Sequence, residues 1–99
     1  MIIHNITFCV ERSIAPEFID WLRGIYVPAV SEAGLSFHTL ARVMGSPDPS
    51  ADSYALQFSA DGLGAIKRWT DGPEAAFEAE IASIWGERVL CFTTNLQVL

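Results

Sequence analysis

The feature that most constrains this chain is the order in which two hydrophobic periodicities alternate along it. Apolar and polar side chains first alternate with the period of two that is typical of a half-buried strand, and the repeat then changes to helical spacing. Two more strand-like stretches, a second helical region and a last strand-like stretch follow. The predicted elements are strands at 2–10, 35–44, 53–60 and 88–99, a helix at 16–33, a second helix between Asp61 and Gly86, and a turn-forming loop at 45–52.

The order strand, helix, strand, strand, helix, strand restricts the fold to very few topologies. Right-handed crossovers turn it into a four-stranded antiparallel sheet with both helices on one face. We therefore predict an α+β fold of the ferredoxin-like βαββαβ type, with the strands in the spatial order 4-1-3-2. Because the 99 residues contain no repeat, linker or low-complexity segment, they are expected to form a single domain over 1–99.

Prolines predict where the helices are interrupted. Pro28 lies late in the first helix and should kink it or begin a shorter second piece. In the second helix, Asp71 and Glu74 have the spacing of a capping box, and Pro73 fits a first turn. We therefore expect the second helix to break and restart near residue 72.

The alternation within each strand divides the sheet into a covered face and an uncovered face. Large apolar side chains should lie under the helices, Leu90, Phe92 and Leu96 of the last strand among them. The uncovered face then receives small, uncharged polar side chains, to which the second strand is expected to add His38 and Arg42. The face assignment of the second strand stays open. The expected uncovered set is Asn5, Thr7, Cys9, His38, Leu40, Arg42, Met44, Gln57, Ser59, Cys91, Thr93, Asn95 and Gln97.

An uncovered face of this composition predicts a partner. Hydrophobic residues make up 51% of the chain and charged residues only 18%, whereas a face exposed to water normally carries Lys and Glu. We therefore expect a homodimer that buries this face. Two interpretations have equal weight: a partner sheet encloses a small-molecule pocket, or the two faces pair their polar groups with each other and with trapped water.

Five side chains of this face are the candidates for ligand binding: Arg42, His38, Asn5, Gln57 and Thr93. Arg42 could hold a carboxylate in a bidentate fork, or pair with a carboxylate across the dimer interface. His38 could act as a general base near neutral pH, although a lone histidine is more often a hydrogen-bonded structural residue. The other three would supply hydrogen bonds within a cavity.

Other polar side chains are interpreted as structural. His4 is expected near the edge of its strand, and Glu74, Glu78 and Glu80 are interpreted as a solvated helix face rather than paired catalytic carboxylates. No CxxC, HxxxH or HExxH spacing offers a metal site. We therefore expect neither a metal nor a cofactor.

The pairing of the first strand with the last can also be predicted. These strands are antiparallel neighbours in the expected order, and one register places like side chains opposite each other. That register opposes Cys9 and Cys91 as reduced thiols on the uncovered face, while Phe8 and Phe92 pair on the core face. A slip of one residue would turn every side chain of one strand to the other face, whereas a slip of two would keep the faces.

Composition argues against several classes of partner. The net charge of −6, with only 6 Lys and Arg residues, argues against nucleic acid because phosphate binding needs clustered cations. No apolar run reaches the length of a membrane span, and the first residues lack the features of a signal peptide. We therefore expect a cytoplasmic protein that contacts neither nucleic acid nor membrane, and whose 2 cysteines are free thiols.

Three stretches, MIIHNITFCVE, WLRGIYVPAVSEAGL and WGERVLCFTTNLQVL, resemble a bacterial family of short proteins known only as a domain of unknown function. The family is associated with the dimeric alpha/beta-barrel, ferredoxin-like superfamily, so the resemblance implies that fold and self-association. The superfamily includes cofactor-free monooxygenases, lactone isomerases, haem-handling enzymes and ligand-binding regulators, and none of these activities follows from the fold alone. Tyr26 and Ile81 stand where the resemblance implies histidines, so chemistry that depends on those histidines would not be shared.

Three functions are consistent with these patterns. The first is a homodimeric small-molecule-binding module with its pocket on the uncovered face. The second is a cofactor-independent monooxygenase- or isomerase-like enzyme that uses Arg42 and His38, and the third is a structural or interaction protein without a ligand. A closed cavity lined by Arg42, Asn5 and Gln57 would favour the first two, and a packed interface would favour the third.

Overall fold

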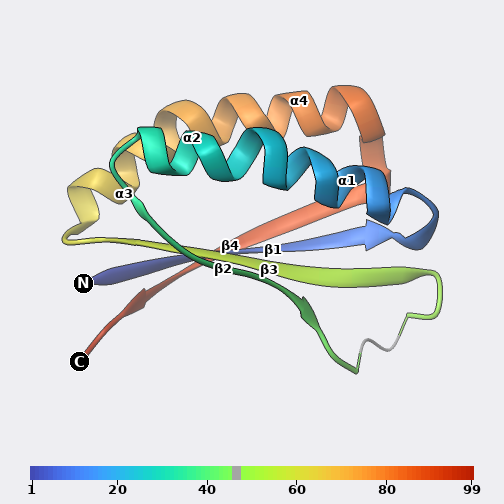
Figure 1. The fold of residues 1–99 in the computed structure, drawn as a ribbon, viewed down its shortest axis with the longest axis horizontal. Helices are drawn as coiled ribbons and strands as arrows, with labels where there is room; N and C mark the ends of the chain where they lie inside the picture. Colours follow the sequence, from blue (N-terminus) through green and yellow to red (C-terminus); the bar gives the residue numbers. More distant parts are fainter. Residues whose placement is uncertain (46–47) are drawn as a thin grey trace.

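The computed structural model of the chain is a layer of helices on one face of an antiparallel sheet (Figure 1). It describes residues 1–45 and 48–99, so Ser46 and Pro47 of the predicted loop lie outside the described part. Within that part the strand order is β2-β3-β1-β4, which is the predicted order read from the other edge. The elements are β1 (Ile2–Glu11), α1 (Ala15–Trp21), α2 (Val27–Glu32), β2 (Ser36–Val43), β3 (Ala51–Ala60), α3 (Leu63–Trp69), α4 (Ala75–Trp85) and β4 (Val89–Gln97).

The helices run on through wide, π-helical turns. Leu22–Tyr26 joins α1 to α2, and Thr70–Glu74 joins α3 to α4. The predicted break near residue 72 is wrong, since the backbone on both sides of the second wide turn is right-handed helical. Pro73 lacks an N–H and would clash with the carbonyl group four residues earlier in an α-helix, and the wider turn accommodates it. Pro28 likewise stands in the first turn of α2, directly after the other wide turn.

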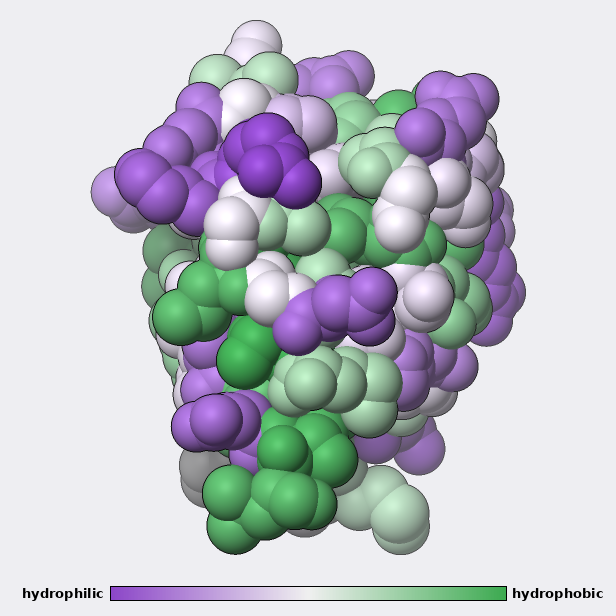
Figure 2. All heavy atoms as spheres, turned by 90° about the vertical axis from the view of Figure 1, so that its left-hand side faces the viewer, coloured by the Kyte–Doolittle hydropathy of each residue, from purple (hydrophilic) through white to green (hydrophobic). Residues whose placement is uncertain are grey.

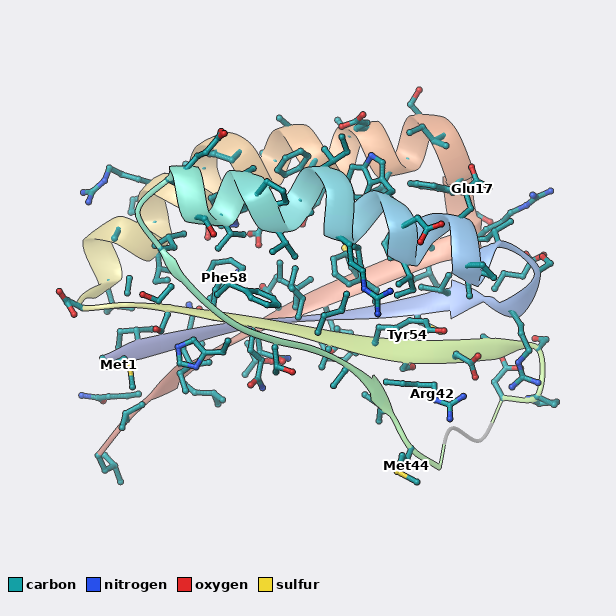
Figure 3. The ribbon with its side chains drawn as sticks, in the orientation of Figure 1. Met1, Glu17, Arg42, Met44, Tyr54 and Phe58 are labelled. Atoms are coloured by element: carbon teal, nitrogen blue, oxygen red, sulfur yellow. The ribbon has the colours of Figure 1, made fainter. Side chains whose placement is uncertain are left out.

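Aromatic side chains fill the space between the sheet and the helices. Phe58 points from β3 toward the helices (Figure 3), and Phe8 meets Phe18 and Tyr26 with ring centroids 5.2 and 6.2 Å apart. Tyr26 in turn contacts Trp69, with 5.7 Å between centroids, which connects the two helical segments. Aromatic pairs of this kind each add about 0.5–1.5 kcal/mol beyond the burial of their area, so they help to fix the helices over β1.

The register between β1 and β4 differs from the predicted one by one residue. Cys9 lies opposite Leu90 and Phe8 lies opposite Cys91, so the two thiols are on different faces and the predicted Cys9–Cys91 pair is wrong. A slip of one residue exchanges the two faces of a strand. The uncovered face thereby gains Leu90, Phe92 and Leu96, and the helix side receives Val89, Cys91, Thr93, Asn95 and Gln97.

A buried histidine explains this register. His4 is only 1% exposed, and its Nδ1 lies 2.6 Å from Oδ1 of Asn95, which requires Asn95 on the helix side of β4. A buried imidazole that lost this partner would cost free energy. Little would be gained in return, because β4 is buried only at Val89, and apolar side chains farther along its helix side would stay largely in water.

A bulge in β2 changes which of its side chains face the helices. The pairing of β2 with β3 shifts between Phe37 and Thr39. Beyond the bulge Arg42 lies opposite Tyr54, whose partner on β1 is the core residue Phe8. The expectation that Leu40 and Arg42 face away from the helices is therefore wrong, and β2 instead contributes Thr39, Ala41 and Val43 to the uncovered face.

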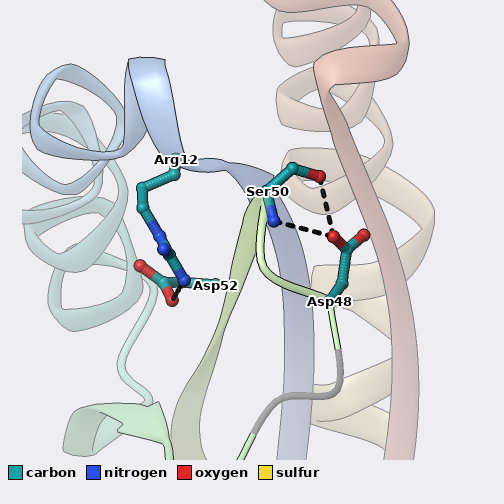
Figure 4. Close-up of polar contacts among 4 residues, drawn as sticks. All are labelled: Arg12, Asp48, Ser50 and Asp52. Carbon is teal, nitrogen blue, oxygen red and sulfur yellow. Dashed lines mark hydrogen bonds and ion pairs between the residues drawn. The ribbon is translucent and has the colours of Figure 1, made fainter.

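Short polar contacts anchor the start of β3 to the end of β1 (Figure 4). Asp48 accepts hydrogen bonds from the hydroxyl and the backbone N–H of Ser50, at 2.7 and 2.8 Å, and these bonds lower the pKa of the Asp48 carboxyl group. The Arg12 backbone N–H donates to the Ser50 carbonyl at 2.8 Å, and the Arg12 guanidinium pairs with Asp52 at 3.2 Å. Arg42 lines the same hollow as this ion pair, at the outer edge of the sheet.

Candidate functional site

The uncovered face of the sheet is almost free of charge. Among the described strand residues that the pairing places on it, Glu11 at the end of β1 is the only one with a carboxylate, guanidinium or ammonium group. Such a surface is typical of an interface rather than of a sheet in contact with water. It consists of Ile3, Asn5, Thr7, Cys9 and Glu11 from β1, Ser36, Thr39, Ala41 and Val43 from β2, Ala51, Ser53, Ala55, Gln57 and Ser59 from β3, and Leu90, Phe92, Thr94 and Leu96 from β4.

A row of hydrogen-bonded polar side chains crosses the centre of the uncovered face. Gln57 Nε2 donates to Asn5 Oδ1 at 3.2 Å, and Asn5 Nδ2 donates to Thr7 Oγ1 at 3.2 Å. Thr7 can still donate its hydroxyl proton, and Gln57 can still accept at its carbonyl oxygen. The row is therefore held in place by its own bonds and keeps groups that can bind an uncharged molecule.

Large apolar side chains border this polar row on the β4 side. Leu90, Phe92 and Leu96 are 60%, 62% and 44% exposed, and Phe92 lies directly opposite Thr7. Val43 stands near the opposite edge of the face, on β2. Apolar side chains exposed next to one another on a sheet face mark a surface that another molecule covers.

The five candidate ligand residues do not lie together. Asn5 and Gln57 are hydrogen-bonded neighbours on the uncovered face, and His38 Nε2 lies 2.7 Å from the hydroxyl of Ser59, which belongs to that face. Arg42 lies on the helix side. Thr93 also lies there, opposite the core residue Ile6, so the expectation that Thr93 is on the uncovered face is wrong. The described strand residues thus place no guanidinium at the centre of the uncovered face.

A second polar cluster lies under the helices, and it was missed from the sequence. His4 Nε2 and Glu74 Oε1 are 2.7 Å apart, and the two residues are 1% and 3% exposed. With the Asn95 carboxamide oriented as in this structure, its oxygen can only accept, so His4 Nδ1 carries a proton. A further proton must then lie between Nε2 and the Glu74 carboxyl group for a hydrogen bond to form. The contact between His4 and Glu74 is an ion pair when His4 is protonated.

Glu74 is the electrostatic centre of this cluster. Burial alone would lower the pKa of His4, but the hydrogen bonds to Glu74 and Asn95 and the charge of Glu74 outweigh it and raise that pKa above 6.5. Burial first, and the charge of Glu74 second, raise the pKa of the Tyr26 hydroxyl and of the Glu78 carboxyl group. Clusters of shifted groups occur at functional sites and in structural ion pairs. Because His4 and Glu74 are buried, we assign them a structural role.

Two signals in the sequence could have revealed the pair. His4 belongs to the core-facing set of β1, together with Ile6 and Phe8, so it had to be buried. Glu74 precedes Phe77 and Ile81 at helical spacing and therefore lies on the apolar stripe of the second helix. The interpretation of Glu74 as part of a solvated helix face is wrong for this reason.

Within residues 1–45 and 48–99, no three His, Cys, Asp or Glu side chains are arranged to hold a metal ion. In the same described part, no helix combines the length and the apolar character needed to cross a membrane.

Comparison with known families gives a match to the whole chain. The family described as Domain of unknown function (DUF4286) matches residues 1–99. The chain belongs to this family. The predicted resemblance to a family of unknown function is thereby confirmed. No curated protein matches the chain.

Solved structures similar to this DUF4286 chain share its fold. A dimeric ferredoxin-like protein from an uncultured marine organism has a TM-score of 0.69 and 13% identity, with 100% of this chain and 95% of that chain covered. The de novo designed protein Foldit4 has a TM-score of 0.65 and 10% identity, with 99% and 98% covered. A candidate antibiotic biosynthesis monooxygenase from Bacillus cereus has a TM-score of 0.56 and 13% identity, with 99% and 94% covered. At these identities the likeness shows the ferredoxin-like fold and no activity.

Proposed function

We propose that this protein is a homodimeric small-molecule-binding module whose ligand lies between the uncovered faces of two sheets. The observation that carries this proposal is the composition of the uncovered face, which is uncharged except at Glu11 among the described strand residues. The structural similarity to a dimeric ferredoxin-like protein supports it.

The apolar side chains of β4 supply the driving force for association. Fully burying a Leu or Phe side chain contributes about 1.5–3 kcal/mol, and a two-fold interface buries each residue twice. Leu90, Phe92 and Leu96 are about half exposed. Burying them in a dimer would offset several kcal/mol of the free energy lost when two chains give up their independent motion. The net charge of −6 opposes the approach of a second chain, but salt screens charges that lie away from the contact.

The distribution of side-chain size over the face supports a cavity. The two central strands carry small or medium side chains, such as Thr7 and Ala55, whereas the larger Leu90 and Phe92 stand on the edge strand β4. When two such faces meet, the larger side chains make contact first and the centre stays open. Ligand pockets combine apolar walls with a few fixed polar groups, and the row formed by Asn5, Thr7 and Gln57 provides such groups.

The alternative of a cofactor-independent enzyme that uses Arg42 and His38 is not favoured. Arg42 lies on the helix side of β2, and His38 is bonded to Ser59, which belongs to the uncovered face. The two side chains therefore do not converge on one reacting group within a single chain.

Sedimentation equilibrium and native mass spectrometry of the purified protein test the proposal. We expect a dimer at low micromolar concentration, with excess mass where a ligand is retained. Phe92→Glu should produce folded monomers, whereas Leu63→Glu, at an equally exposed (62%) position on α3, should leave the dimer intact. Wild-type protein that sediments only as a monomer contradicts the dimer. A dimer that retains no small molecule and whose crystal structure shows a filled interface would support the structural alternative instead.

A further inference from the structure

A separate hollow lies on the helix side of the sheet, where α3 approaches the end of β4. It measures about 460 Å³ and is open to solvent. Figure 2 shows the end of the molecule that carries α3 and the two termini in Figure 1. Apolar and polar patches lie next to one another on this surface. The lining residues are Leu63, Gly64, Ile66, Lys67, Thr70, Asp71 and Asn95. They include none of the residues that form the uncovered face.

The buried histidine orients a hydrogen-bond donor toward this hollow. The carboxamide oxygen of Asn95 lies 2.6 Å from His4 Nδ1, and His4 is itself held by Glu74 at 2.7 Å. Because the oxygen is committed to the buried side, the NH₂ group is what Asn95 can offer to a molecule in the hollow. A side chain oriented by a buried partner loses little freedom on binding, so its hydrogen bond is more effective.

The remaining lining residues favour an uncharged ligand. Lys67 Nζ and Asp71 Oδ2 are 2.6 Å apart, so the two charges at the hollow neutralise each other. Leu63 is 62% exposed although it is large and apolar, and Ile66 is buried behind it. An apolar wall with one oriented N–H donor and a threonine hydroxyl matches an apolar ring that carries an acceptor oxygen.

We infer that this hollow is a second binding site, which takes a small uncharged molecule with a carbonyl oxygen on an apolar body, such as a cyclic ketone or lactam. The Asn95 NH₂ group donates to the carbonyl oxygen, and Leu63 covers the apolar body. This goes beyond the proposed function, because Asn95 faces the helices whereas the proposed dimer contact is on the other face of the sheet.

Titration of the ¹⁵N-labelled full chain with cyclohexanone tests the inference by NMR. We expect a saturable downfield shift of the Asn95 side-chain NH₂ signals, together with shifts of the backbone amides of Leu63 and Thr70. Glu17 is the internal control, because it lies at the end of the helical layer opposite α3 (Figure 3) and its backbone amide should not move. Cyclohexanecarboxylate, which has the same ring and a negative charge, should bind at least several-fold more weakly.

Variants separate the hollow from the fold. Asn95→Ala should abolish the response, but it also removes the partner of His4 and could disturb β4. Leu63→Glu therefore serves as the second variant, because it places a charge in the hollow without touching His4, and it should also abolish binding. Ile84→Glu is the matched control, because it places the same charge at an exposed position of α4, outside both the hollow and the uncovered face, and should bind cyclohexanone normally. Equal shifts at Glu17 and Asn95, unchanged binding by Leu63→Glu, or tighter binding of the carboxylate would overturn the inference.

Discussion

Glu74 Oε1 lies 2.7 Å from His4 Nε2, and this buried contact ties the wide turn of the second helix to the first strand of the sheet. Through His4 the tie extends to Asn95, so one imidazole connects β1, β4 and the helical layer. Both side chains lie in the core, where apolar residues are usual. Removing one of them would leave the other as an unpaired buried polar group, which destabilises the fold. The consequences of this contact can be measured.

The His4–Glu74 pair should make stability depend on pH. The pKa of His4 is raised above 6.5 in the folded protein. The contribution of protonated His4 to stability is therefore fully present below pH 6.5, the ordinary pKa of histidine, and is lost as the pH rises through the pKa of the folded state. Chemical denaturation between pH values of about 6 and 8.5, below the range in which ordinary Tyr and Lys side chains titrate, should show this decline. His4→Gln should flatten the profile, whereas His38→Gln should keep it. A wild-type profile that rises over this interval contradicts the assignment.

Removing one member of the pair should cost more than removing both. Glu74→Leu leaves His4 buried without its acceptor, and we expect a loss of about 3 kcal/mol or more in the free energy of unfolding. The double variant His4→Phe/Glu74→Leu should lose clearly less than the sum of the two single variants, because no unpaired polar group remains. Urea denaturation of the four proteins measures this coupling, and additive losses would show that the two side chains do not interact.

The two cysteines should behave as separate thiols. Cys9 and Cys91 point to opposite faces of the sheet, so mild oxidation followed by peptide mapping should yield no intrachain Cys9–Cys91 link. Burial, and then the charges of Glu78 and Glu74, raise the pKa of the Cys91 thiol. Glu78→Gln should therefore speed the alkylation of Cys91 at neutral pH and leave Cys9 unchanged. Recovery of the link from folded protein would restore the register predicted from the sequence.

Two phenylalanines of neighbouring strands should differ sharply in their effect on stability. Phe8 is buried in the core, and Phe8→Ala is expected to cost about 3–5 kcal/mol. Phe92 is 62% exposed on the uncovered face, and Phe92→Ser should change the stability of the monomer by no more than about 0.5 kcal/mol. Denaturation at submicromolar concentration, where the proposed dimer dissociates, separates this effect from association. Equal losses for the two variants would indicate that Phe92 is in the core.

The fold could be predicted from the sequence because hydrophobic periodicity determines both the type and the order of its elements. The strand order, the helices and the core positions of β1 and β3 follow from that pattern. The face of β4 could not be predicted, because an edge strand has little burial to specify which side of it is apolar. There a polar contact, from His4 to Asn95, decides the register. The misplacement of Thr93 and Cys91 followed from that one strand.

The bulge in β2 had a similar effect on the candidate site. Alternation assigns residues to faces only while the pairing is regular, and an extra residue reverses the assignment of everything beyond it. Arg42 comes after the bulge and His38 lies within it, so a strict alternation grouped two side chains that the fold separates. Asn5 and Gln57, on the regular strands β1 and β3, were placed correctly next to each other.

The wide turn at Thr70–Glu74 also sets the rotational phase of the second helix. Each residue of an α-helix turns the chain by about 100°. A π-helical turn accommodates one extra residue, so the residues after it keep nearly the rotational phase that they would have without that residue. Trp69 before the turn and Glu74 at its end both reach the core only with this offset. A uniform α-helix of the same length would place these two side chains about 140° apart and rotate one of them out of the core, whereas deleting Gly72 would remove the extra residue and keep both on one face. The wide turn is therefore the device by which the second helix carries one extra residue, and the exposed Gly72 is the position at which that residue can be removed.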